Sequence, residues 1–166
     1  MIRALLTGAA IGGIAARRPY DCAMPRTVEV SVVVPAPIED VWADLAQLES
    51  HSEWMRDAEA IEFLTDQRAG VGTRIRVPTR VGPLTTVDEM QFTAWEPPHR
   101  MAIDHQGKFS GQGEIALQET LEGTVVTWRE RVKFPWTFAG PIGEFVAAPI
   151  LRWIWKKNLE ALSERF

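Results

Sequence analysis

Residues 28–54 constrain the fold more than any other segment, because they predict one strand followed by two short helices. Valine occupies every second position of the strand, and successive strand side chains point to opposite faces, so the valines share one face. Pro37 suits the first position of a helix. Ser50 and Glu53 have the spacing of a capping box, which predicts the start of the second helix. The first helix is indicated by apolar residues at helical spacing: Ile38, Val41, Trp42 and Leu45.

Residues 109–121 and 124–134 predict a long β-hairpin. Glu122-Gly123 is a two-residue connection with the glycine that such turns favour. One face of the hairpin is then largely apolar and the other polar, which predicts a sheet with one covered side and one wet side. The turn implies a register that pairs Leu121 with Thr124, Glu119 with Val126, Leu117 with Trp128, Ile115 with Glu130, and Gly113 with Val132.

The remaining segments predict shorter strands and a long final helix. Residues 139–165 carry apolar residues at helical intervals, so this helix is expected to cover the apolar side of the sheet. Pro149 lies inside it and is expected to kink or divide it. The shorter strands are expected to pair antiparallel in chain order, over residues 61–65, 73–78, 84–95 and 100–105.

Composition indicates one globular domain and excludes several classes of function. Of 166 residues, 46% are hydrophobic and 24% charged, an ordinary soluble composition. The net charge is −4, and the first 24 residues carry three arginines and one aspartate, so residues 25–166 carry −6 and are not expected to bind nucleic acid. Cys22 is the single cysteine, which excludes an internal disulfide and fits a cytoplasmic location.

Metal and nucleotide cofactors are not expected either. The three histidines lack the paired spacing of metal ligands. The run Gly111-Gln112-Gly113-Glu114-Ile115-Ala116 has the letters of a dinucleotide-binding loop, but it begins a strand and does not open a helix. We therefore expect no metal and no cofactor.

Residues 1–24 are expected to form an apolar, flexible extension outside the domain of residues 25–166. As a helix, the apolar run Ala4–Ala16 would reach only about 20 Å, short of the roughly 30 Å hydrocarbon core of a bilayer. Three interpretations stay open: a disordered extension upstream of a true start at Met24, a weak interfacial membrane anchor, and a signal peptide.

Several short motifs, taken together, resemble one known superfamily. They are Pro35-Ala36-Pro37, Val41-Trp42, Asp44, Trp54, Gly70-Val71-Gly72-Thr73, Trp95-Glu96-Pro97-Pro98 and the long amphipathic C-terminal helix. With these motifs, residues 27–166 resemble the START-like superfamily (SRPBCC), most closely its polyketide cyclase/dehydrase and lipid-transport branch. The resemblance implies an α+β helix-grip fold, in which a curved antiparallel β-sheet wraps around a long C-terminal α-helix and two short helices follow the first strand.

Such a fold leaves an internal cavity between sheet and helix unless the inward side chains are unusually bulky. The alternative is that the same side chains fill an ordinary core. Alternation along the strands predicts the inward, ligand-binding set: Ile75, Val77, Asp88, Met90, Phe92, Met101, Ile103, Ile115, Leu117, Trp128 and Val132, with Trp153 from the helix.

Two polar residues on the inward face are candidate catalytic groups. Glu130 lies between Trp128 and Val132 on that face and is a candidate acid, base or anchor for a polar ligand group. His105 ends a strand, and its ordinary pKa lies near neutrality, so it is a candidate proton donor or acceptor. The alternative for both is a structural role.

Three functions fit these observations. The first is a carrier or binding protein for a hydrophobic small molecule of lipid, polyketide or isoprenoid type. The second, implied by the resemblance, is a cofactor-independent polyketide cyclase, aromatase or dehydratase that uses Glu130 or His105. The third is a regulatory or membrane-surface module that uses exposed tryptophans, Trp136, Trp153 or Trp155. The oligomeric state stays open.

Overall fold

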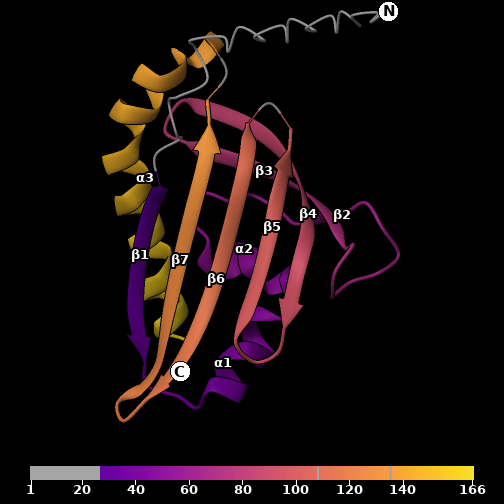
Figure 1. The fold of residues 1–166 in the computed structure, drawn as a ribbon, viewed down its shortest axis with the longest axis vertical. Coiled ribbons are helices and arrows are strands. Elements are labelled where there is room, and N and C mark those ends of the chain that lie inside the picture. The colour runs from indigo at the N-terminus through magenta and orange to yellow at the C-terminus, as the bar shows by residue number, and fades with distance from the viewer. Residues whose placement is uncertain (1–26, 108, 135) are drawn as a thin grey trace, which may run out of the picture.

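The computed structural model describes residues 27–107, 109–134 and 136–166 (Figure 1). The expectations for residues 1–24, including Cys22, lie outside the described residues. In chain order the elements are β1 (Thr27–Val34), α1 (Ile38–Leu45), η1 (Leu48–Ser50), α2 (His51–Trp54), β2 (Glu62–Phe63), β3 (Arg74–Val81), β4 (Leu84–Glu96), β5 (Arg100–Gln106), β6 (Ser110–Thr120), β7 (Gly123–Lys133), η2 (Trp136–Phe138) and α3 (Gly140–Ser163).

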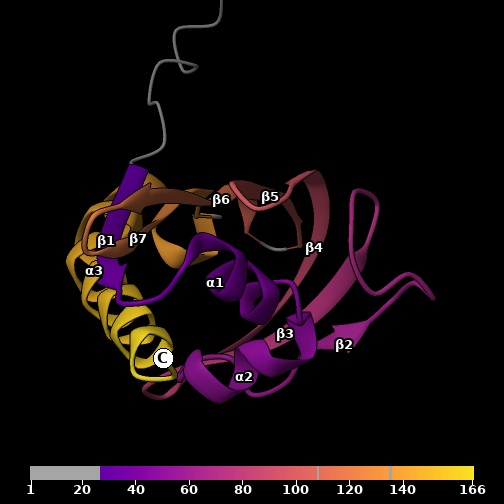
Figure 2. The ribbon, with the colours of Figure 1, turned by 90° about the horizontal axis from the view of Figure 1, so that it is seen from below.

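The strands form one curved antiparallel sheet in the order β1-β7-β6-β5-β4-β3-β2. Figure 2 shows α3 beside β1, with α1 and α2 lying across the open side of the curve. The long helix packs chiefly against β1 and β7. The expected α+β helix-grip architecture is therefore confirmed.

The opening segment folds as its pattern predicts. The alternating valines of β1, at positions 28, 30, 32 and 34, face inward, and Val34, Val41 and Leu45 are completely buried. The capping box, however, is wrong. Ser50 makes no capping bond to α2, and its hydroxyl instead donates to the Gln47 carbonyl oxygen at 2.8 Å.

The expected β6–β7 register is off by two residues, because the turn residues are Leu121-Glu122. The Thr120 hydroxyl closes this turn by donating to the Gly123 carbonyl oxygen at 2.8 Å. Gly123 opens β7 at a φ of +124° and passes so close to the Val34 carbonyl oxygen that a side chain would collide with it. A shift of two keeps every side chain on its face, so the expected faces are confirmed while the partners change. The observed pairs include Leu117 with Val126, Ile115 with Trp128, and Gly113 with Glu130.

A β-bulge in β4 brings an extra aromatic side chain inside. The pairing of β4 with β5 shifts between Phe92 and Ala94. Phe92 and Trp95 consequently share the inner face, which simple alternation forbids, and their rings lie 5.2 Å apart. Trp95 also meets Trp42 of α1 edge to face at 5.6 Å, which ties the bulge to the first helix.

The final helix α3 is continuous through Pro149, so the expected division of the helix is wrong, while a kink at this residue stays a prediction. Pro149 lies on the exposed side, where water can replace the backbone bond that proline removes. Further along, Asn158 is fully buried; its Oδ1 accepts from the Arg56 backbone N–H at 3.1 Å and its Nδ2 donates to Asp57 Oδ1 at 2.6 Å. These bonds fix the helix to the segment after α2.

The same helix also covers the free edge of β1. Lys156 Nζ donates to the Ser31 carbonyl oxygen at 2.7 Å, and the Ser163 hydroxyl donates to the Val33 carbonyl oxygen at 3.3 Å. None of the helices in the described ranges is both long and apolar enough to cross a membrane.

Candidate ligand-binding site

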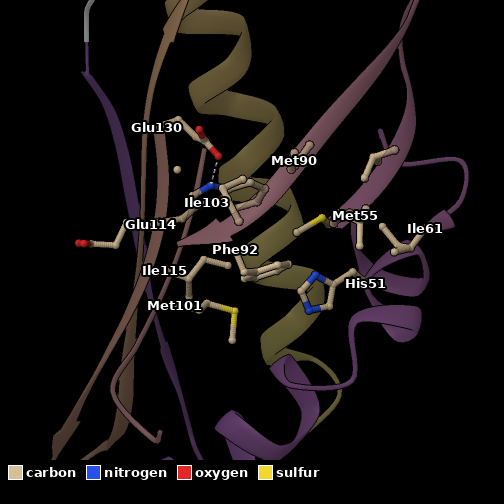
Figure 3. Close-up of a pocket in the computed structure, with 14 residues that line it drawn as sticks. His51, Met55, Ile61, Met90, Phe92, Met101, Ile103, Glu114, Ile115 and Glu130 are labelled. Atoms are coloured by element: carbon tan, nitrogen blue, oxygen red, sulfur yellow. Dashed lines mark hydrogen bonds between the residues drawn. The ribbon is translucent and has the colours of Figure 1, made fainter. Parts of the chain in front are cut away.

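A chamber of about 90 Å³ lies between the inner face of the sheet and the segment that runs from α2 to β2 (Figure 3). None of its described lining residues comes from α3, so the expected position of the cavity between the sheet and the C-terminal helix is wrong. The chamber's volume is below the roughly 300–1,000 Å³ of a typical small-molecule site. Most of its wall is aliphatic, aromatic or methionine, and flexible methionines can move to enlarge it. The lining residues are His51, Met55, Ile61, Ile75, Val77, Met90, Phe92, Met101, Ile103, Gly113, Glu114, Ile115, Trp128 and Glu130.

Alternation along the strands placed most of the wall correctly. Eight residues of the expected ligand-binding set line the chamber: Ile75, Val77, Met90, Phe92, Met101, Ile103, Ile115 and Trp128. Glu130 also reaches its wall, next to Trp128. Their roles toward a ligand stay predictions.

Four members of that set lie elsewhere. Leu117 is buried in the core, Asp88 lies behind His105, and Val132 borders a smaller void beneath α3. Trp153 points to solvent with 63% of its surface exposed, so its expected inward position is wrong. The tryptophan two residues later turns inward instead. Trp155 is 8% exposed and stacks on Trp128 with 5.4 Å between the rings.

Periodicity gave no signal for the far wall. His51, Met55 and Ile61 come from α2 and the loop after it, where no strand alternation applies. Glu114 borders the chamber only near its backbone, because its carboxylate points away in Figure 3 and pairs with Arg100 on the outer face at 2.7 Å.

Behind the chamber wall, three polar side chains that the sequence nominated singly form one cluster. His105 Nε2 donates to Glu130 Oε2 at 3.0 Å, and Nδ1 donates to Asp88 Oδ2. The other Glu130 oxygen, Oε1, accepts from Trp128 Nε1 at 2.9 Å. Because the two carboxyl groups bind opposite nitrogens of one ring, they do not converge on a point, and the described ranges contain no group placed to hold a metal ion.

Glycines make the cluster possible. His105 lies on β5 and Glu130 on β7, and β6 runs between these two strands. Neighbouring strands are about 4.8 Å apart, so the two side chains can meet only where β6 has no side chain on the inner face. There β6 presents Gly111 and Gly113, which pair with His105 and Glu130. A Cβ on Gly113 would lie 2.5 Å from Glu130 Oε1, and one on Gly107 would lie 2.8 Å from Asp88 Oδ1.

The cluster changes the protonation of His105. Burial alone would lower the pKa of His105, but the hydrogen bonds to Asp88 and Glu130 and the charges of those groups outweigh it and raise the pKa to about 10. The ring is therefore an imidazolium at neutral pH, and titration near neutrality, expected from the sequence, is wrong. Both ring nitrogens are then donors already in use.

His51, on the far wall, has the opposite character. Its pKa is lowered, chiefly because the ring is buried, although a hydrogen bond to the Leu45 backbone opposes the shift. Nε2 donates to the Leu45 carbonyl oxygen at 2.8 Å. In the neutral ring the other nitrogen, Nδ1, is a hydrogen-bond acceptor.

Structures of known proteins share this fold at low sequence identity. The protein TTHA0849 from Thermus thermophilus matches with a TM-score of 0.71 and 19% identity over 84% of this chain and 96% of its own. A START superfamily protein from Mycobacterium smegmatis matches with a TM-score of 0.67 and 16% identity, over 84% and 95% of the two chains. The di-domain aromatase/cyclase StfQ of the steffimycin biosynthetic pathway matches with a TM-score of 0.68 and 11% identity, over 83% of this chain and 49% of its own.

Sequence comparison gives a relative and a family. An uncharacterised protein of Mycobacterium tuberculosis, Rv1546, is 25% identical over 142 residues, which are 84% of this chain and 98% of the relative. The family model described as polyketide cyclase / dehydrase and lipid transport matches residues 25–166. The fold is shared with a START superfamily structure, and the family model matches nearly the whole chain. The protein therefore belongs to the polyketide cyclase / dehydrase and lipid transport family.

Proposed function

We propose that this protein is a carrier or binding protein that holds a hydrophobic small molecule in the chamber. One observation carries the proposal: the chamber is walled almost entirely by apolar side chains, and the polar side chains that reach it, Glu130 and His51, already have hydrogen-bond partners. Burial of apolar ligand surface supplies most of the affinity in such a site. Because the chamber is small, Met55, Met90 and Met101 move aside for a ligand of lipid, polyketide or isoprenoid size.

Native mass spectrometry of protein purified from its own host tests this proposal. A retained apolar molecule is expected, and its mass identifies the ligand class. The variant Ile103→Phe fills the chamber and is expected to lose the molecule while staying folded. Leu121→Phe introduces the same side chain at an exposed turn, away from the chamber, and is expected to keep the molecule. A ligand that survives Ile103→Phe unchanged would place the binding site elsewhere.

Catalysis as a cofactor-independent cyclase, aromatase or dehydratase is the less favoured alternative. Glu130 supports it, because the side chain borders the chamber and could act on a bound carbonyl compound. However, both Glu130 oxygens already accept hydrogen bonds, and His105 does not line the chamber. Conversion of a bound poly-carbonyl compound by the wild type, lost in Glu130→Gln, would favour catalysis over carriage.

A second function, contact with a membrane surface, is favoured by an apolar stripe on the outside of α3. The stripe consists of Ile142, Val146, Ile150 and Trp153, which share the exposed side of the helix, and Trp136 just before the helix is 83% exposed. Two exposed basic residues lie near its C-terminal end and complement anionic lipids: Arg152, next to Trp153, and Lys157, which pairs with Glu160 at 2.7 Å.

Co-sedimentation with vesicles that contain anionic lipid tests this contact. Trp136→Ala combined with Trp153→Ala is expected to reduce binding, whereas Leu121→Ala, at an exposed turn, is not. Binding that depends only on residues 1–24, lost when they are removed but kept in the double variant, would assign the contact to that extension.

A further inference from the structure

We propose that the ligand of the chamber is an apolar molecule with a hydroxyl group, an alcohol or a phenol, rather than a carboxylate or a phosphate. This inference rests on the proposed binding function and adds the chemical class of the ligand. It follows from the hydrogen-bonding character of the chamber wall.

At the sheet end of the chamber the polar group offers acceptors only. The two potential donors beside it, Trp128 Nε1 and His105 Nε2, are both used by Glu130, at 2.9 and 3.0 Å. A carboxylate has about four lone-pair positions, so Glu130 can accept one more hydrogen bond from a ligand. A ligand that can only accept finds no free donor at this end.

The opposite wall has the same character. The Nε2–H of His51 is donated to the Leu45 carbonyl oxygen at 2.8 Å, which leaves Nδ1 as an acceptor in the neutral ring. Burial lowers the pKa of His51 and thereby favours the neutral ring. Figure 3 shows His51 and Glu130 on different sides of the chamber. A hydroxyl at either end of a ligand therefore meets an acceptor.

The charges around the chamber disfavour anions. No lysine or arginine is among the described residues that line it, and the outward Glu114 is paired with Arg100 and Arg129 on the other face of the sheet. The cluster behind the wall consists of two acidic side chains and one histidine whose two ring nitrogens both already donate within it. A bound carboxylate or phosphate would therefore be desolvated without meeting a cation or a free donor, and an ammonium would lose its hydration. An uncharged hydroxyl loses the least hydration of these groups and finds an acceptor.

Three probes of matched shape test the inference at pH 7: ethylbenzene, 4-ethylphenol and 4-ethylbenzoate. Dissociation constants are measured by NMR titration of the full-length protein, following the methionine methyl groups and the Trp128 indole N–H. The phenol is expected to bind most tightly, at least about tenfold more tightly than the benzoate. The phenol hydroxyl can donate to the acceptors in the chamber wall, whereas the benzoate carboxylate can only accept and finds no donor there.

Two variants connect the preference to the chamber. Glu130→Gln is expected to narrow the gap between phenol and benzoate, whereas Glu119→Gln, the same change at an exposed position, is expected to leave it unchanged. If Glu130→Gln does not fold, the ranking in the wild type decides alone. Equal binding of all three probes, or tightest binding of the benzoate, overturns the hydroxyl inference but leaves a hydrophobic carrier standing. Binding of none of them overturns the carrier proposal and this inference together.

Discussion

Replacing Gly113 with alanine places a methyl group where the Glu130 carboxylate now lies. The added Cβ would be 2.5 Å from Oε1, 2.8 Å from Cδ and 2.9 Å from Oε2. The carboxylate is the end of a flexible side chain and can swing away, but only by leaving the Trp128 and His105 donors. The substitution is therefore expected to break the polar cluster without directly disturbing the apolar core.

The cost can be worked out from those two donors. Each buried donor left without a partner costs about 1–3 kcal/mol, and alanine returns roughly 0.5–1 kcal/mol because it suits a strand better than glycine. Gly113→Ala is thus expected to lower the free energy of unfolding by about 1–5 kcal/mol, measured by urea denaturation. Intrinsic strand preference alone predicts the opposite sign.

A double-mutant cycle separates the clash from other effects of the methyl group. In a Glu130→Ala background the space is empty, so Gly113→Ala is expected to be neutral or slightly stabilising. The indole N–H signal of Trp128 is expected to shift in Gly113→Ala alone, as its acceptor leaves. An equal loss of stability in both backgrounds, or no loss in either, would refute the inference that the missing side chain of Gly113 makes room for the Glu130 carboxylate.

Three further results are expected. Trp155→Ala is expected to lower the free energy of unfolding by about 3–5 kcal/mol, measured by urea denaturation, because it leaves a cavity beside Trp128. Trp153→Ala, at an exposed position, is expected to change it by less than about 0.5 kcal/mol. Similar losses in the two variants would contradict the stacked arrangement. Since the pKa of His105 is raised to about 10 from 6.5, its contribution to stability is complete below pH 6.5 and is lost as the pH rises toward 10, so His105→Gln is expected to flatten the stability profile in that range. The lowered pKa of His51 acts in the opposite direction, because below pH 6.5 the ring takes up a proton more readily in the unfolded chain than in the folded protein. The free energy of unfolding is therefore expected to fall as the pH drops below 6.5. A His51→Gln variant with the same acid sensitivity would exclude this cause.

The helix-grip fold was implied by the family resemblance. The strand walls of the chamber were predictable from the residues themselves, because a two-residue period determines the face of each side chain wherever one face is buried. The same logic explains how the hairpin register was wrong by two residues while the faces stayed correct. Gly123 resembles a turn residue in sequence, yet its backbone lies against the Val34 carbonyl oxygen, and only a three-strand arrangement reveals that contact.

The polar cluster was not predictable as a unit. Asp88, His105 and Glu130 were each nominated from strand parity, but their contact depends on strand order and on glycines that clear the inner face of β6. A sequence signal for it exists in Gly111 and Gly113, two glycines on the inward positions of a strand. The far wall, with His51, comes from a helix and a loop. Strand alternation does not apply there, so the sequence pattern does not predict which of their side chains face the chamber.

The bonds from α3 to β1 affect how the molecule behaves in a crowded solution. A strand at the border of a sheet offers unsatisfied amide and carbonyl groups on which another chain can template itself. Here Lys156 and Ser163 occupy two carbonyl groups of one border, while the other border is the two-residue strand β2, too short to template much pairing. The sheet therefore resists growth by intermolecular strand addition at either end, even though its border strand β1 is rich in valine.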